Sequence, residues 1–205
     1  MHEQRLHDLR RFYSILDRLE ESNGGARKFG ACSGRMDWPE RGVYFIRECG
    51  EECADSRSGP RIVRVGTHAL KAGSGTRLWT RLSQHRGQSS TGGGNHRGSI
   101  FRLLVGTALI RRNGLAFPTW GDGSSAAAEI RRGEVALETK VSAVIREMSL
   151  LWLAIEDEPG DQSLRGYIER NAIALLSNYG KPPLDPPCLS NKTNERSCTR
   201  ERWSA

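Results

Sequence analysis

Three polar residues that could act on a phosphate recur at intervals of four: Arg77, Arg81 and His85. If this segment is helical, the spacing places them on one face, opposite the apolar side of the helix. Arginine clamps phosphate well, and histidine can move a proton near neutral pH. Such a stripe taken alone is more often a solvated helix surface. It therefore predicts phosphate chemistry only if other residues join it.

A carboxylate occupies an unusual position further along the chain. Glu169 is followed by Ala172, Ile173 and Leu176 at helical spacing, so it lies along a largely apolar stripe. A carboxylate at such a partly buried position needs a metal ion or an arginine partner. Arg165 lies one turn earlier, and the sequence predicts either an Arg165–Glu169 ion pair or a metal ligand at Glu169.

Two further groups could take part in chemistry. Tyr44 lies in the middle of an apolar segment, where a tyrosine is usually a packing residue and only sometimes a proton acceptor. Residues 90–97 form a glycine-rich loop that ends in Asn95, His96 and Arg97. This donor cluster could contact a phosphate backbone or a groove edge, or it could belong to a plain mobile loop.

The elements that must position these residues follow from hydrophobic periodicity and turn residues. Residues 42–47 and 61–66 predict a hairpin, and the run at 150–155 predicts a strand buried on both faces. Ser74 or Thr76 is predicted to cap the short helix that carries the stripe, and Gly87 to end it. Further helices are predicted at 3–21, 99–112, from 134, and from a cap at Asp161 or Ser163 to about 177.

This element order predicts one α+β domain with a small three-stranded antiparallel sheet flanked by helices. We divide the chain into an N-terminal helix and lead-in (1–41), a core domain (42–180) with a helical insertion at about 87–147, and a proline-rich polar tail (181–205).

Composition limits the partners. The chain has 205 residues, with 31 basic against 24 acidic, a net charge of +7, and arginine far outnumbers lysine. That balance favours nucleic acid as the partner, the alternative being an arginine excess that only reflects a GC-rich coding sequence. No apolar run is long enough to span a bilayer. Five cysteines without a signal peptide indicate reduced thiols, so we expect a cytoplasmic protein.

In order along the chain, four of these features resemble the GIY-YIG nuclease superfamily. They are Gly42-Val43-Tyr44, then Arg64-Val65-Gly66, then Arg81 followed four residues later by His85, and finally Glu169. Each motif is weak alone, whereas four in order with the expected elements between them are far more specific. The resemblance covers about residues 42–178. It departs at Arg64, where the family usually has tyrosine, and the family's late asparagine has only Asn178 and Asn191 as candidates.

The resemblance implies a divalent-metal-dependent endonuclease that hydrolyses DNA, with RNA not excluded. It implies catalytic roles for Tyr44, Arg64, Arg81, His85 and Glu169, with Glu169 holding Mg²⁺ or Mn²⁺. We expect the nucleic acid itself to contact Arg77, Arg86, Asn95, His96 and Arg97. Restriction, defence and mobile-element processing are all compatible roles.

A second hypothesis is a non-catalytic nucleic-acid-binding protein that keeps the same scaffold, which the exchange at Arg64 motivates. Glu169 distinguishes the two, because a carboxylate that faces a polyanion without a metal ion repels it.

Overall fold

The computed structural model describes residues 2–53 and 59–177. Along the chain the elements are α1 (His2–Ser22), β1 (Arg27–Lys28), η1 (Phe29–Ala31), β2 (Gly42–Glu52), β3 (Pro60–Gly66), α2 (Leu78–Arg86), η2 (His96–Gly98), α3 (Ile100–Asn113), α4 (Ala128–Glu147), β4 (Ser149–Ala154) and α5 (Leu164–Leu176). The predicted α+β class is confirmed.

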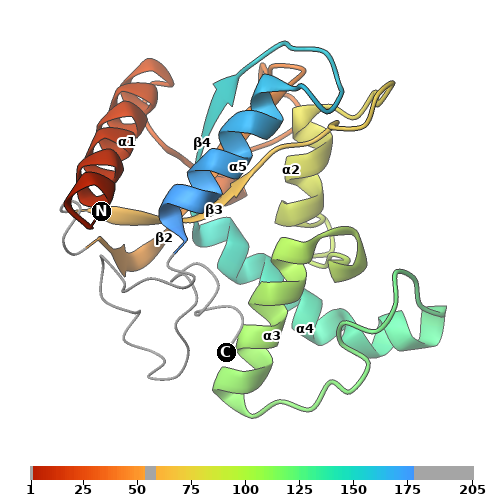
Figure 1. The fold of residues 1–205 in the computed structure, drawn as a ribbon. Coiled ribbons are helices and arrows are strands. Elements are labelled where there is room, and N and C mark those ends of the chain that lie inside the picture. Colours follow the sequence, from red (N-terminus) through yellow and green to blue (C-terminus); the bar gives the residue numbers. More distant parts are fainter. Residues whose placement is uncertain (1, 54–58, 178–205) are drawn as a thin grey trace.

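The sheet is antiparallel and has the order β1-β4-β2-β3 (Figure 1). The hairpin of β2 and β3 is as predicted, and β4 pairs with the other edge of β2. The sheet has four strands in the described part of the chain, rather than the three predicted. The additional strand, β1, consists of Arg27 and Lys28 alone, and two exposed basic residues carry no alternating pattern that could reveal a strand.

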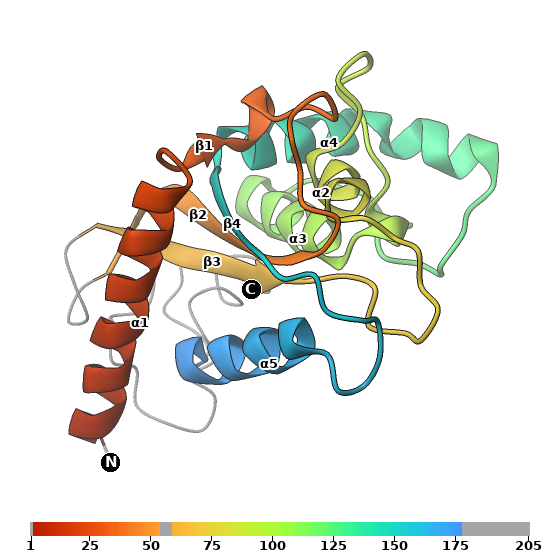
Figure 2. The same cartoon turned by 90° about the horizontal axis from the view of Figure 1, so that it is seen from above.

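The sheet lies between two layers of helices (Figure 2), with α5 on one side and α2, α3 and α4 on the other. Alternate residues of β2 point to opposite faces, as pleating requires. Val43 and Phe45 join the core formed with α1 and α5, whereas Tyr44 and Ile46 join the core formed with α2, α3 and α4. Both faces of β2 are therefore buried, which explains its nearly continuous apolar sequence.

The insertion is the helical pair α3 and α4, and buried charges fix it to α2. Arg102 of α3 is fully buried and donates from Nε to Glu138 of α4 at 2.9 Å, and from Nη1 to the carbonyl of His85 at 3.0 Å. Such a buried pair is tolerated only when its remaining donors and acceptors are satisfied. Arg102 also donates to Ser142 Oγ at 2.9 Å, so this condition is met.

The helix boundaries differ from expectation in two places. Neither Ser74 nor Thr76 caps α2: Arg77 occupies the N-cap without a side-chain bond, and Leu78 N donates to the Glu40 carbonyl at 2.8 Å instead. The α4 helix begins at Ala128, before the predicted start at Glu134, because its first turns are exposed and have no apolar stripe to mark them.

Other boundaries agree. Gly87 ends α2 with a φ of 79°, and the side chain of Ser163 caps α5 by accepting from Gly166 N. Within the described ranges, no helix has the length and apolar character needed to cross a membrane. Cys32 and Cys53 are buried, and neither forms a disulfide with a described residue.

Candidate functional site

The centre of the candidate site is a buried chain of hydrogen bonds that links β2, α2 and α3. Tyr44 Oη lies 2.8 Å from His85 Nε2, and His85 Nδ1 lies 2.6 Å from Ser99 Oγ. Ser99 is the N-cap of α3 and also accepts from Arg102 N at 3.2 Å. Both rings are fully buried. The arrangement can pass a proton between the phenol and the imidazole without a water molecule.

His85 does not lie on a solvent-facing stripe with Arg77 and Arg81, as the four-residue spacing predicted. Its side chain faces the core together with Leu78 and Leu82, since positions 78, 82 and 85 form the apolar face of the short helix. Burial lowers the pKa of His85 well below its usual value, and the positive charges of Arg81 and Arg64 lower it further. The imidazole is therefore neutral, and its Nε2 can accept a hydrogen bond from the phenol.

Arg64 and Arg81 bring positive charge to this pair from two elements. Arg64 lies opposite Ile46 in the β2–β3 ladder, next to the Tyr44–Gly66 pair and on the same face. Its Nε is buried, and no described residue accepts from it. Arg81 donates from Nη1 to Gln84 Oε1 at 3.0 Å and to the Gly98 carbonyl at 3.1 Å. An unsatisfied buried guanidinium nitrogen is costly, and an anionic ligand would satisfy it.

The glycines of the first two motifs, Gly42 and Gly66, leave the space that the packing around Tyr44 requires. A Cβ on Gly66 would lie 2.2 Å from Tyr44 Oη, and one on Gly42 would lie 2.6 Å from the Leu153 carbonyl oxygen. Neither glycine has a left-handed φ, so the requirement is for space. Tyr44 can lie across its cross-strand partner only because that partner has no side chain.

Glu169 reaches the same end of the sheet from the opposite layer. Its Oε1 accepts a hydrogen bond from the backbone N–H of Thr67, the residue directly after β3, at 3.2 Å. The predicted Arg165–Glu169 ion pair does not form, because Arg165 pairs with Asp157 instead. In the described part of the chain, Glu169 has no ion-pair partner, and its carboxylate is partly exposed.

Hydrogen bonds from several elements hold the turn that follows β3. Thr67 Oγ1 donates to the Gly42 carbonyl at 2.8 Å, and Arg165 Nη1 donates to the His68 carbonyl at 2.5 Å. Ala69 has a φ of +53°, a conformation that costs free energy for a residue with a Cβ. Such strain persists only where the surroundings impose it, and the fully buried Arg165 provides that constraint.

His68, which the sequence analysis did not single out, lies within this turn. Its Nε2 lies 3.2 Å from the Glu40 carbonyl oxygen, so Nε2 carries the proton and donates. Its Nδ1 is buried without a partner in the described residues. Burial lowers the pKa of His68 to about 4, and Arg165, Arg41 and Arg81 lower it as well. The only sequence signal is its place two residues after the second motif.

The residues at the end of the loop that were expected to contact nucleic acid are bonded to other parts of the protein. Arg97 forms two bonds to Glu134, at 2.5 and 2.9 Å, and only 3% of its side chain is exposed. His96 is buried, with Nδ1 2.9 Å from Glu138. Asn95 caps η2 by accepting from Arg97 N. These contacts favour a structural role for His96 and Arg97 over the predicted contact with nucleic acid.

The two remaining arginines of this group stay near the surface. Arg77 pairs with Glu40 at 3.1 Å, with both side chains exposed. Arg86 lies over the ring of Trp79 at 5.1 Å and donates to Ser89 Oγ at 2.7 Å. Exposed pairs contribute little to stability, so Arg77 can exchange its partner for a phosphate at small cost.

The donor set limits what metal ion the site could hold. No group of three or more histidine, cysteine, aspartate or glutamate side chains comes together in the described ranges. A single partly exposed carboxylate, Glu169, fits an ion such as Mg²⁺ that keeps most of its water ligands. The two asparagine candidates, Asn178 and Asn191, lie outside the described residues.

Comparison with known proteins gives one match. A family model described as GIY-YIG domain matches residues 3–201. No curated protein and no solved structure matches the chain significantly.

Substitution of Gly66 tests the close approach of Tyr44. We expect Gly66→Ala to destabilise the protein by about 1 to 3 kcal/mol in chemical denaturation, because the new methyl group overlaps the phenol ring. Gly133→Ala is the matched control: it lies within α4 with nothing near its Cβ, and should stabilise by about 0.5 to 1 kcal/mol. Equal stability of Gly66→Ala and wild type would contradict the packing described here.

The buried histidines predict a stability that falls in acid. The unfolded chain protonates His68 near pH 6.5 but the folded chain only near 4, so the folded state loses stability as pH falls between these values, by up to about 1.4 kcal/mol per pH unit. His68→Gln should show a shallower loss in urea unfolding, whereas His7→Gln, at an exposed position, should follow wild type. Identical profiles for the two variants would refute this account.

Proposed function

Because the chain belongs to the GIY-YIG domain family, whose members are in general nucleases, we propose that it is a divalent-metal-dependent endonuclease acting on DNA. RNA presents the same phosphodiester group, so the assays below include it. We further propose a cytoplasmic location, which the buried free thiols support, and a role in restriction, defence or mobile-element processing.

The observation that carries the proposal is the 2.8 Å contact between Tyr44 Oη and His85 Nε2 beside two arginines. Hydrolysis requires a proton to leave the attacking water as its oxygen bonds to phosphorus. We propose that the anionic phosphate, by offsetting the charges of Arg64 and Arg81, lets the imidazole accept the phenol proton while Tyr44 accepts that of the water. Both rings are buried, so the proposal requires that substrate binding opens a path to Tyr44 Oη.

The arginines would stabilise charge on the phosphate. Arg64 offers a buried Nε that needs an acceptor, and Arg81 is fixed by its bonds to Gln84 and Gly98. Preorganised cations of this kind cost no reorganisation when charge builds on the phosphoryl oxygens. A cation at position 64, where the family usually has tyrosine, is therefore compatible with this chemistry.

Glu169 would hold the divalent ion, with water completing its coordination. When bound there, such an ion would supply Lewis-acid stabilisation of the charge that develops on the phosphate. The hydrogen bond from Thr67 N fixes one carboxylate oxygen, which orients the other. The alternative, a binding protein without catalysis, leaves this carboxylate only the structural bond from Thr67 N.

Removal of one hydroxyl tests the proton transfer. We expect Tyr44→Phe to reduce single-turnover cleavage of labelled duplex DNA in Mg²⁺ by at least ~10²-fold, because the ring is kept and only the proton acceptor is lost. Tyr167→Phe on α5 is the matched control, since Tyr167 is 57% exposed, and it should cleave like wild type. Unchanged cleavage by folded Tyr44→Phe would reject the role of this phenol.

Glu169→Gln tests the metal site and keeps an oxygen that can accept from Thr67 N. We expect cleavage and the rise in melting temperature with Mg²⁺ to be lost, while binding of DNA or RNA in EDTA persists or tightens as a negative charge is removed. The exposed Asp161→Asn should change neither. A folded Glu169→Gln protein with full activity would contradict the assignment, and a wild type that binds but never cleaves would favour the scaffold hypothesis.

A further inference from the structure

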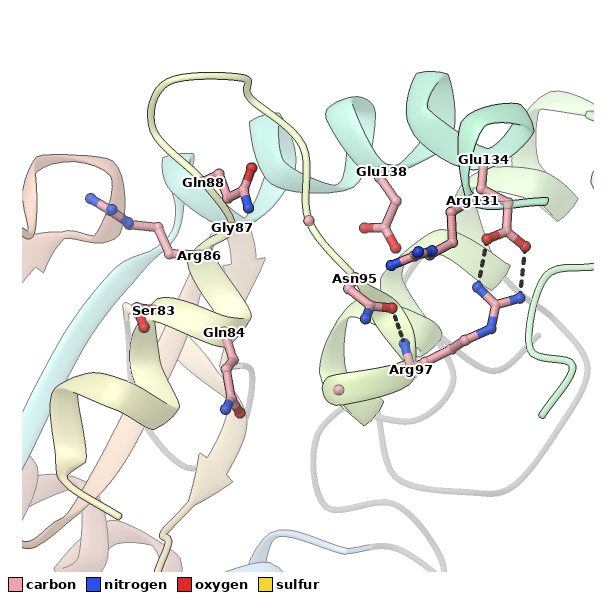
Figure 3. A pocket seen from close by; sticks show the side chains of 12 residues that line it. Ser83, Gln84, Arg86, Gly87, Gln88, Asn95, Arg97, Arg131, Glu134 and Glu138 are labelled. Atoms are coloured by element: carbon pink, nitrogen blue, oxygen red, sulfur yellow. Dashed lines mark hydrogen bonds and ion pairs between the residues drawn. The ribbon is translucent and has the colours of Figure 1, made fainter. Parts of the chain in front are cut away.

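A polar cavity of about 640 Å³ opens between α2, the segment after it and α4 (Figure 3). Its walls include Gln84 from α2, Gln88 and Asn95 from the connecting segment, and Arg131 and Glu134 from α4. Figure 3 shows Arg131 extending from α4 toward Asn95. Nothing in the chemistry proposed above uses this space.

The acidic groups of the cavity are already neutralised. Arg97 forms two bonds to Glu134 and lowers the pKa of that carboxyl. Burial opposes ionisation of Glu138, but hydrogen bonds from His96 and the charge of Arg102 lower its pKa. The carboxylates therefore do not repel an anion as free ones would, whereas Arg131 has no ion-pair partner in the described part of the chain.

The amide side chains offer donors to the cavity. Each amide oxygen accepts a bond from within the protein: Gln84 Oε1 from Arg81 at 3.0 Å, Gln88 Oε1 from Thr91 Oγ1 at 3.0 Å, and Asn95 Oδ1 from Arg97 N at 3.1 Å. These bonds fix which way each amide faces. The three amide nitrogens have no acceptor among the described residues, so together with Arg131 they line the cavity with donors.

This cavity shares a wall with the candidate active site. Arg81 Nη1 donates both to Gln84 and to the Gly98 carbonyl, and both residues line the cavity. A ligand bound there would lie one side chain away from the cation expected to meet the scissile phosphate. A set of donors with an unpaired arginine suits a group that is anionic and accepts hydrogen bonds only, which describes a phosphodiester.

We propose that this cavity binds a phosphodiester of the substrate strand that flanks the cleaved one. The inference rests on the proposed function for the identity of the strand, and on the donor set for the chemistry of the ligand. Arg131 makes the charged contact, and the amide of Asn95, toward which Arg131 extends, adds a hydrogen-bond donor (Figure 3). The cavity would thereby set the register of the strand relative to Tyr44 and Glu169.

The test compares two adjacent arginines of α4. Arg131 lines the cavity and Arg132 does not; both are exposed and without partners in the described residues. Binding of duplex DNA to full-length Arg131→Gln and Arg132→Gln is measured in EDTA across a salt series. We expect Arg131→Gln to weaken binding roughly fivefold to tenfold near 0.1 M salt and to lower the salt slope by about 0.9, with Arg132→Gln close to wild type.

A second arm identifies the source of the phosphate. Duplexes that carry one neutral methylphosphonate linkage near the cleavage point should include one linkage that weakens wild type as Arg131→Gln does, and that weakens Arg131→Gln no further. If no linkage behaves so while inorganic phosphate competes in wild type alone, the cavity holds free phosphate and the proposal fails.

The remaining outcomes separate this inference from the proposed function. Equal losses in both arginine variants would assign the effect to general positive charge and overturn the cavity site. Normal cleavage together with unchanged binding in Arg131→Gln would also overturn it while leaving the nuclease intact. Arg131-dependent binding by a wild type that cleaves nothing in Mg²⁺ or Mn²⁺ would support the cavity and refute the nuclease.

Discussion

The packing of Tyr44 against a residue that has no side chain is the constraint on which the rest of the site depends. Strand β2 is one of the two internal strands of the sheet, and its residue 44 must place a phenol across the neighbouring strand toward α2. Gly66 permits this, and the hydroxyl then meets His85 at hydrogen-bond distance. His85 in turn bonds to Ser99, the N-cap of α3. The contact between Tyr44 and His85 therefore also fixes the start of α3 relative to the sheet.

A second constraint acts at the end of β3. Arg165, paired with Asp157, holds the carbonyl groups of His68 and Ala69, and Ser163 also bonds to Asp157. The start of α5 is thus fastened to the turn whose first N–H meets Glu169. Because these bonds impose the conformation of the turn, Ala69 keeps a strained positive φ, and His68 Nδ1 has no partner among the described residues. The bonds that hold this turn in its strained conformation thereby fix the position of the Thr67 N–H, and with it the position of the Glu169 carboxylate.

The sequence allowed prediction of the layers and the order of the motifs, because hydrophobic period and glycine position report local geometry directly. The sequence did not reveal that the side chain of His85 faces the core. In a helix as short as α2, residues at four-residue spacing can turn from the solvent-facing side to the buried side. Nor could spacing distinguish a free Arg97 from one paired with Glu134, a residue 37 positions away. Local spacing offered Glu169 as one possible partner of Arg165, whereas folding brings Asp157 to it. Long-range pairing of charges is where reasoning from local pattern ends.

The two faces of the sheet carry different parts of the candidate site. Tyr44 and His85 lie in the core under α2, α3 and α4, whereas Glu169 lies in α5, in the opposite layer. Neither core alone assembles the set, so a chain in which only one layer has formed lacks either the Tyr44–His85 hydrogen bond or the Glu169 carboxylate. During synthesis, α5 leaves the ribosome after the other described elements. A newly made chain therefore lacks the complete candidate site until α5, the last described helix, docks on the sheet.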